Sequence, residues 1–196
     1  MKTNHLNNPN NRANWLKSPV NSGALRHYLI NKGSLTRRLQ SNSQQFSVKP
    51  ICLVQAKALQ DEAALLTLKP QQYALLRDVL LVCDGTPVVF AHSVLPKRSL
   101  RGEWRGLGRL GSKPLGATLF ANPKVQRTPL SYKKLGSHHR LYKRIMQLGD
   151  SATMLSGNAE LPVLWARRSV FSLNKISLGY AQILVTEVFL PSVLKL

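Results

Sequence analysis

The sequence predicts an α+β domain built on a single antiparallel β-sheet. Two observations carry this prediction: segments with helical periodicity stand near the start of the chain, and β-rich runs paired through short turns follow them. Strand and helix patterns do not alternate along the sequence as they do in parallel βα units. The 196 residues, 43% of them apolar, suffice for one domain with a sizeable core, expected at residues 14–196.

The N-terminal stretch MKTNHLNNPNNRANW contains six Asn residues and no apolar core. Asn favours turns and buries little surface, so residues 1–13 are expected to form a disordered tail rather than a secretory signal. The longest apolar runs, such as 79–83 and 88–91, are far shorter than the roughly 18 residues that cross a bilayer. We therefore expect a cytoplasmic protein.

Two helices are predicted before the first strand. The first lies within residues 19–33, with Ser22 as its candidate N-cap. The second follows Ser34, a plausible cap, and its Leu35 and Leu39 fall four residues apart on one face.

A β-hairpin is the strongest local signal in the chain. Residues 75–83 and 86–95 are β-rich runs on either side of Asp84-Gly85, a dipeptide that tolerates positive φ. A weaker strand, 46–54, precedes it, and Pro50 confines that strand to a sheet edge or a bulge.

The register of this hairpin decides which side chains share a face. A two-residue loop places Arg77 opposite His92, and a four-residue loop would move its partner to Val94. Either register puts Arg77 and His92 on the same face of the sheet.

The second half of the chain is less regular. Residues 97–113 form a basic, Gly-punctuated loop, and 114–120 begin a short helix. The segment 124–160 is interpreted as a mobile insertion. Residues 163–173 and 180–190 predict a second hairpin that closes the sheet.

The net charge of +20 attracts anions, but charge alone does not name the partner. Nucleic acid, an anionic membrane surface and a small anionic ligand all fit. The sequence contains no recognisable nucleic-acid-binding module, so no specific nucleic acid is expected. His138 and His139 lack partners at ligand spacing, and no metal site is predicted.

Glu187 is the most informative acidic residue, because the alternation in ILVTEVFLP places it on an apolar strand face. A buried carboxylate must be paired or protonated. It is either a structural partner of Arg77, Arg167 or Arg168, or a group that exchanges a proton with a ligand. Arg167 and Arg168 point to opposite faces, so at most one of them joins a shared site. Arg77 is likewise either structural or a fork for a ligand carboxylate.

Five segments in order carry a family resemblance: SLTRRL at 34–39, LLRDVLLVCDGTPVVFAHSVLP at 75–96, KPLGATLF at 113–120, LWARRS at 164–169 and LVTEVFLP at 184–191. Together they resemble the bacterial chorismate pyruvate-lyases of ubiquinone biosynthesis. The resemblance implies a cytoplasmic lyase that removes pyruvate from chorismate to give 4-hydroxybenzoate. It also implies a sheet of about six strands with helical flaps over a buried ligand.

The resemblance assigns roles residue by residue. It implies that Arg77 binds a carboxylate of the ligand, that Glu187 meets the opposite end near the hydroxyl, and that both are catalytic. Leu35, in a flap, and Leu115 would contact the substrate. His92 stands where the family often has arginine, which makes it a possible second cation.

The resemblance implies no cofactor and no metal, and we expect a monomer. Weak association with an anionic membrane surface is a further expectation. Two alternatives stay open: a non-catalytic ligand sensor of the same fold, similar to effector domains of bacterial transcription regulators, and a basic protein that binds nucleic acid or membranes.

Overall fold

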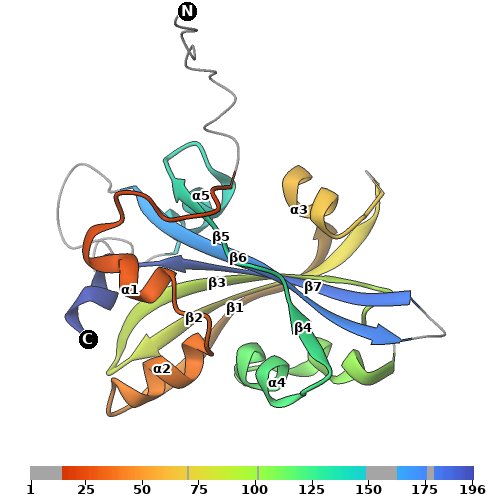
Figure 1. The fold of residues 1–196 in the computed structure, drawn as a ribbon, viewed down its shortest axis with the longest axis horizontal. Coiled ribbons are helices and arrows are strands. Elements are labelled where there is room, and N and C mark those ends of the chain that lie inside the picture. The colour runs from red at the N-terminus through yellow and green to blue at the C-terminus, as the bar shows by residue number, and fades with distance from the viewer. Residues whose placement is uncertain (1–14, 70, 101, 149–162, 176–178) are drawn as a thin grey trace, which may run out of the picture.

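The computed structural model describes residues 15–69, 71–100, 102–148, 163–175 and 179–196 (Figure 1). It is an α+β fold with one open antiparallel sheet, as predicted. The expected tail at 1–13 and the end of the segment 124–160 lie outside the described residues. No helix in the described ranges combines the length and the apolar character needed to cross a bilayer.

The sheet follows the order β1-β2-β3-β7-β6-β4, and β5 also pairs with β6. Because β4 and β5 pair with successive stretches of β6, they share the sixth position of the sheet. The strands are β1 (Phe46–Lys57), β2 (Tyr73–Cys83), β3 (Thr86–Pro96), β4 (Val125–Arg127), β5 (Ser131–Leu135), β6 (Leu164–Lys175) and β7 (Gly179–Phe189).

Helices cover both faces of the sheet (Figure 1). The face that carries Arg77 and Glu187, here called the site face, lies under η2 (Gly23–Leu25), α1 (Arg26–Leu29), α2 (Leu35–Ser41), η3 (Gly102–Arg109) and α4 (Leu115–Ala121). The opposite face lies under α3 (Gln60–Leu65) and α5 (Arg140–Met146), and η4 (Pro191–Lys195) ends the chain.

The first predicted helix is shorter than expected. The segment 19–33 forms only η2 and α1, which together end at Leu29. Ser22 occupies the predicted N-cap position, but its side chain makes no capping hydrogen bond, because its hydroxyl donates to the carbonyl of Pro19. The second helix is confirmed: Ser34 accepts a hydrogen bond from the N–H of Arg37, at 3.3 Å.

The edge position of the first strand is confirmed. β1 pairs only with β2 in the described sheet, and its register shifts between Pro50 and Cys52, where proline cannot donate to the ladder. The second hairpin, β6 and β7, is also confirmed.

The first hairpin has the predicted two-residue turn, with Asp84 at φ 48° and Gly85 at φ 77°. Its predicted register is wrong. Val82 pairs with Pro87 but Leu81 pairs with Val89, so Val88 is an extra residue in β3. Beyond this bulge Arg77 faces Ser93, and His92 lies on the opposite face of the sheet.

The described part of 124–160 belongs to the sheet and its cover rather than to an insertion. It contributes β4 and β5, both paired with β6, and the helix α5. The helix α3 lies in a stretch for which the sequence predicted no element.

Candidate active site

A small cavity of about 40 Å³ lies between the site face of the sheet and the helices α2 and α4. Its wall contains Leu35, Thr36, Arg77, Val79, Leu81, Ala91, Ser93, Pro114, Leu115, Gly116, Leu119, Phe120, Phe171, Val185 and Glu187. Four residues singled out in the sequence, Leu35, Arg77, Leu115 and Glu187, therefore meet at one site.

Arg77 is the cation of this cavity. It projects from β2 and is buried, and its Nη2 donates to the carbonyls of Gly111 at 2.9 Å and Lys113 at 3.0 Å. Desolvation by burial lowers the pKa of its guanidinium, but an arginine stays protonated near neutral pH. Nη2 is thus engaged with two backbone carbonyls, and, within the described residues, Nε and Nη1 remain to donate to a carboxylate.

Glu187 is the anion of the cavity, and its structural partner is Arg167 rather than Arg77 or Arg168. The two residues stand opposite each other on β7 and β6, and Nε of Arg167 donates to the carboxylate at 2.5 Å. Arg168 points to the opposite face, where it pairs with Asp61 at 2.6 Å. The expectation that only one of the two neighbouring arginines reaches the site is confirmed.

Arg167 also binds the N-terminal part of the chain. Its Nη1 donates to the carbonyls of Tyr28, Leu29 and Asn31 at 2.7, 3.2 and 2.7 Å. The side chain is only 1% exposed. One buried guanidinium therefore fixes both the carboxylate of Glu187 and the segment that leads into α2.

Leu35 and Leu115 are the first residues of α2 and α4, and both are buried against the cavity. The two helices meet closely beside them. A Cβ added to Gly116 would lie 3.3 Å from Oγ1 of Thr36, a tight contact. Two short helices in mutual contact thus form one wall of the cavity.

His92 does not contribute to the site. It lies 1% exposed on the opposite face, with Nδ1 2.5 Å from Asp78 Oδ1 and Nε2 3.3 Å from Glu62 Oε1. Burial opposes protonation of the imidazole, but the two carboxylates outweigh it and raise the pKa of His92 to about 9. The bulge at Val88 places the side chain of His92 on the face of the sheet opposite Arg77. The prediction of a second cation at His92 is therefore wrong.

Arg127, an arginine beside the cavity on β4, is a residue that the sequence pattern did not indicate. Its guanidinium carbon lies 5.4 Å from the ring centre of Phe120 and 5.1 Å from that of Phe171, and both rings line the cavity. The apolar-polar-basic triplet of β4 is too short for a recognisable period, so the pattern alone gave little signal.

In the described part of the chain, no group of three or more His, Cys, Asp or Glu side chains could hold a metal ion. The wall of the cavity thus combines the guanidinium of Arg77, the paired carboxylate of Glu187 and apolar side chains. It can bind an acid at one end and accept a hydrogen bond at the other.

Comparisons with known proteins identify the family of the chain. The family model described as "Chorismate lyase" matches residues 9–195. A protein of Methylobacillus flagellatus named "Probable chorismate pyruvate-lyase" is 49% identical over 189 residues, which cover 94% of this chain and 97% of the relative. A protein of the same name from Nitrosomonas europaea is 45% identical, with 93% and 96% covered.

Among solved structures, the effector domain of PhnF from Mycobacterium smegmatis matches with a TM-score of 0.50 and 12% identity, over 83% of this chain and 91% of that one. At this identity the match concerns the fold alone.

Proposed function

The chain belongs to the chorismate lyase family, and from this premise we propose that it is a chorismate pyruvate-lyase acting in ubiquinone biosynthesis. The enzyme converts chorismate to 4-hydroxybenzoate and pyruvate. The observation that carries the proposal is the cavity with Arg77 and Glu187 on its wall and apolar side chains between them.

In the proposed reaction, the bond between a ring carbon and the ether oxygen of the enolpyruvyl group breaks. The neighbouring ring carbon, which bears the hydroxyl, loses its hydrogen as a proton, and the ring becomes aromatic. The departing enolpyruvyl group takes up one proton at its methylene carbon and becomes pyruvate. Aromatisation drives the reaction, so the protein mainly needs to orient the ring in a dry site.

We assign the ring carboxylate to Arg77 and the ring hydroxyl to Glu187. The carbonyls of Gly111 and Lys113 hold the guanidinium at one end. At the other end, Arg167 holds the carboxylate of Glu187 in place, and this carboxylate accepts a hydrogen bond from the hydroxyl. Leu35 and Leu115 would contact the ring between them.

The position of the cavity has a kinetic consequence. Because α2 and α4 meet beside its apolar wall, we infer that they move apart to admit the substrate and then close over it. Closure excludes water and strengthens the ion pair with the bound carboxylate. The same closure slows the release of 4-hydroxybenzoate.

The direct test is to incubate the purified protein with chorismate and to measure both products. We expect equal amounts of pyruvate and 4-hydroxybenzoate at a rate above the uncatalysed reaction. Arg77→Ala should weaken substrate binding by roughly 2 to 5 kcal/mol, because it removes a buried charge contact. The proposal fails if the wild-type protein forms neither product above background.

A second candidate, a ligand sensor without activity, has one observation in its favour, the fold shared with the PhnF effector domain. The same assay separates the two functions: a sensor would bind 4-hydroxybenzoate or chorismate and leave chorismate intact.

The monomeric state and the weak membrane association expected from the sequence stay predictions. Gel filtration should give a mass near 21.9 kDa for a monomer. Sedimentation with anionic and with neutral vesicles tests the membrane association.

A further inference from the structure

Chorismate carries two carboxylates, and the site described so far accounts for only one of them. Arg77 serves the carboxylate on the ring. His92 lies on the opposite face of the sheet. Arg167 is almost fully buried, and it is already bonded to Glu187 and to three backbone carbonyls. The carboxylate of the enolpyruvyl group therefore needs a different cation.

Arg127 stands at the right end of the site for this task. Across the site face, one row of the sheet runs from Arg77 through Ser93 and Val185 to Ser169. Nε of Arg127 donates to Oγ of Ser169 at 2.7 Å. With strands about 4.8 Å apart, Arg77 and Ser169 mark the two ends of a row about 14 Å long. The two arginines thus approach the cavity from opposite ends.

The orientation assigned to the ring directs the enolpyruvyl group toward the same end. The ether carbon of chorismate adjoins the carbon that bears the hydroxyl, and the hydroxyl is assigned to Glu187. The enolpyruvyl group therefore leaves the ring on the side of Glu187, away from Arg77. Glu187 and Arg127 are close enough to interact: desolvation by burial lowers the pKa of Arg127, and the charge of Glu187 opposes that shift.

The guanidinium of Arg127 is held in place but retains binding capacity. It stacks on Phe120 and Phe171, and its Nη1 donates to the carbonyl of Lys32 at 2.8 Å. Its Nη2 has no hydrogen-bond partner among the described residues. Unlike Arg167, this side chain is only half-buried. It can therefore accept a carboxylate at modest desolvation cost.

We propose that Arg127 binds the enolpyruvyl carboxylate of chorismate and so distinguishes the dianionic substrate from the monoanionic product. The proposal rests on the proposed function. It implies that this arginine is needed to hold chorismate and not to hold 4-hydroxybenzoate, which lacks the group that Arg127 recognises.

The test compares substrate and product in the same variants. Arg127→Gln should raise KM for chorismate about tenfold to a hundredfold, the range expected for a lost charge-assisted hydrogen bond. The inhibition constant of 4-hydroxybenzoate should change less than twofold. Arg127→Lys should recover part of the affinity, because it keeps the charge but not the planar fork.

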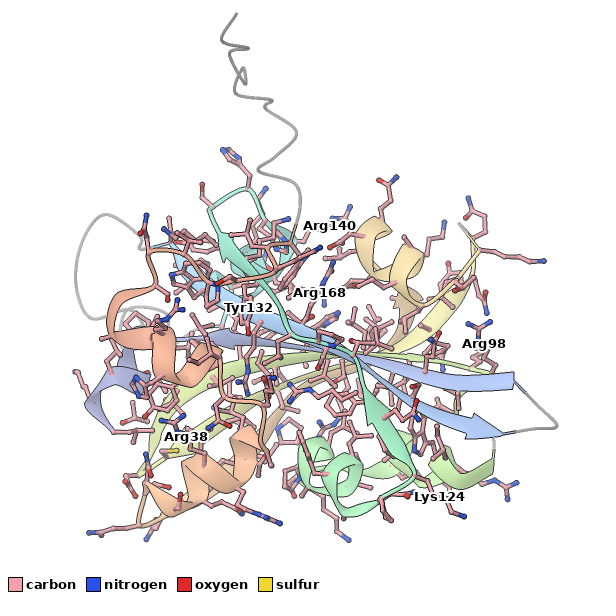
Figure 2. All side chains as sticks on the ribbon, viewed as in Figure 1. Arg38, Arg98, Lys124, Tyr132, Arg140 and Arg168 are labelled. Atoms are coloured by element: carbon pink, nitrogen blue, oxygen red, sulfur yellow. The ribbon has the colours of Figure 1, made fainter. Side chains whose placement is uncertain are left out.

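The matched control is Arg140→Gln, which removes the same charge from an exposed position of α5 on the opposite side of the sheet (Figure 2). It should leave both constants within twofold of wild type. If Arg127→Gln weakened the binding of chorismate and of 4-hydroxybenzoate equally, the proposal would be overturned, because Arg127 would then act by holding β4 and α4 in place. An unchanged KM would overturn it as well.

The failure of this inference differs from the failure of the proposed function. If the wild-type protein has no lyase activity, calorimetric titration with chorismate and with 4-hydroxybenzoate replaces the kinetic assay. A selective loss of chorismate binding in Arg127→Gln would support the role of Arg127, and an equal loss or none would refute it.

Discussion

At the scale of single residues, the site depends on the ion pair between Arg167 and Glu187, which is largely shielded from solvent. Arg167 is 1% exposed and its partner Glu187 16%. Removing one member of such a pair leaves the other uncompensated, which typically costs 3–5 kcal/mol. The two members are not equivalent here. Besides its bond to Glu187, Arg167 donates to three backbone carbonyls in the segment 28–31, and these bonds do not involve Glu187.

We therefore expect Arg167→Gln to lower the free energy of unfolding by about 3 to 5 kcal/mol. Glu187→Gln should cost clearly less, since its amide oxygen can still accept from Nε and the three carbonyl contacts persist. Urea denaturation of both variants at neutral pH measures the difference. Equal losses would show that the carbonyl contacts contribute little.

His92 makes stability depend on pH on the opposite face of the sheet. Its folded pKa of about 9 lies above the unfolded value of about 6.5, so its stabilising contribution is complete below pH 6.5 and disappears as the pH rises through 9. We expect the free energy of unfolding to fall across this range by an amount on the order of 3 kcal/mol. Urea denaturation at pH 6, 7, 8 and 9.5 measures it.

Two variants isolate this effect. His92→Gln should remove most of the decline, whereas His27→Gln, at an exposed position, should keep it. A decline of the same size in His92→Gln would assign the pH dependence to other groups.

At the scale of elements, the short helices α2 and α4 line the cavity and contact each other beside it. Gly116 of α4 faces Thr36 of α2, and there is little room for another carbon between them. A methyl group at this position would require Oγ1 of Thr36 to move by a few tenths of an ångström. Ligand binding and helix contact are coupled there.

We expect Gly116→Ala to hold α2 and α4 farther apart and to weaken the binding of 4-hydroxybenzoate severalfold, although alanine favours a helix more than glycine does. Gly116→Ala combined with Thr36→Ala should recover the affinity, because it removes the atom that the new methyl group meets. Calorimetric titration of both variants, with Thr36→Ala alone as reference, measures this coupling. No recovery in the double variant would contradict the steric explanation.

The elements also show how far the sequence could predict the molecule. Strong local signals succeeded: Asp84-Gly85 specified its turn, Pro50 its edge strand and Ser34 its helix cap. The face of His92 failed on one extra residue, Val88, because a bulge shifts the alternation by one and local sequence does not mark it. The three-residue strand β4 depends on pairing with β6, which no local pattern encodes.

For the candidate site as well, the residues with a local signal were predicted and those that depend on pairing between strands were not. Arg77 and Glu187 stood out because charged residues are rare on apolar strand faces. The choice of Arg167 as the partner of Glu187 required the register between β6 and β7, which only the structure supplies. Arg127 required both the register of β4 and the neighbouring aromatic rings.

At the scale of the whole molecule, the charge of +20 acts beyond the site. The basic side chains labelled in Figure 2 stand on several sides of the sheet: Arg38 and Lys124 beside the site face, Arg98 and Arg140 beyond it. These basic residues therefore do not lie on a single face of the sheet. The positive field of the net charge raises the encounter rate with a dianion, and salt weakens this field over about 10 Å at 0.1 M.

We therefore expect kcat/KM for chorismate to fall severalfold as the ionic strength rises from 0.02 to 0.5 M, with kcat nearly constant, because screening acts on the encounter. An anion that competes for Arg77 would produce a similar decline, but it would depend on the identity of the salt. Sodium chloride and sodium sulfate compared at equal ionic strength separate the two causes. Steering by the whole molecule predicts coincident curves, whereas a sulfate curve well below the chloride curve would attribute the decline to occupation of the site.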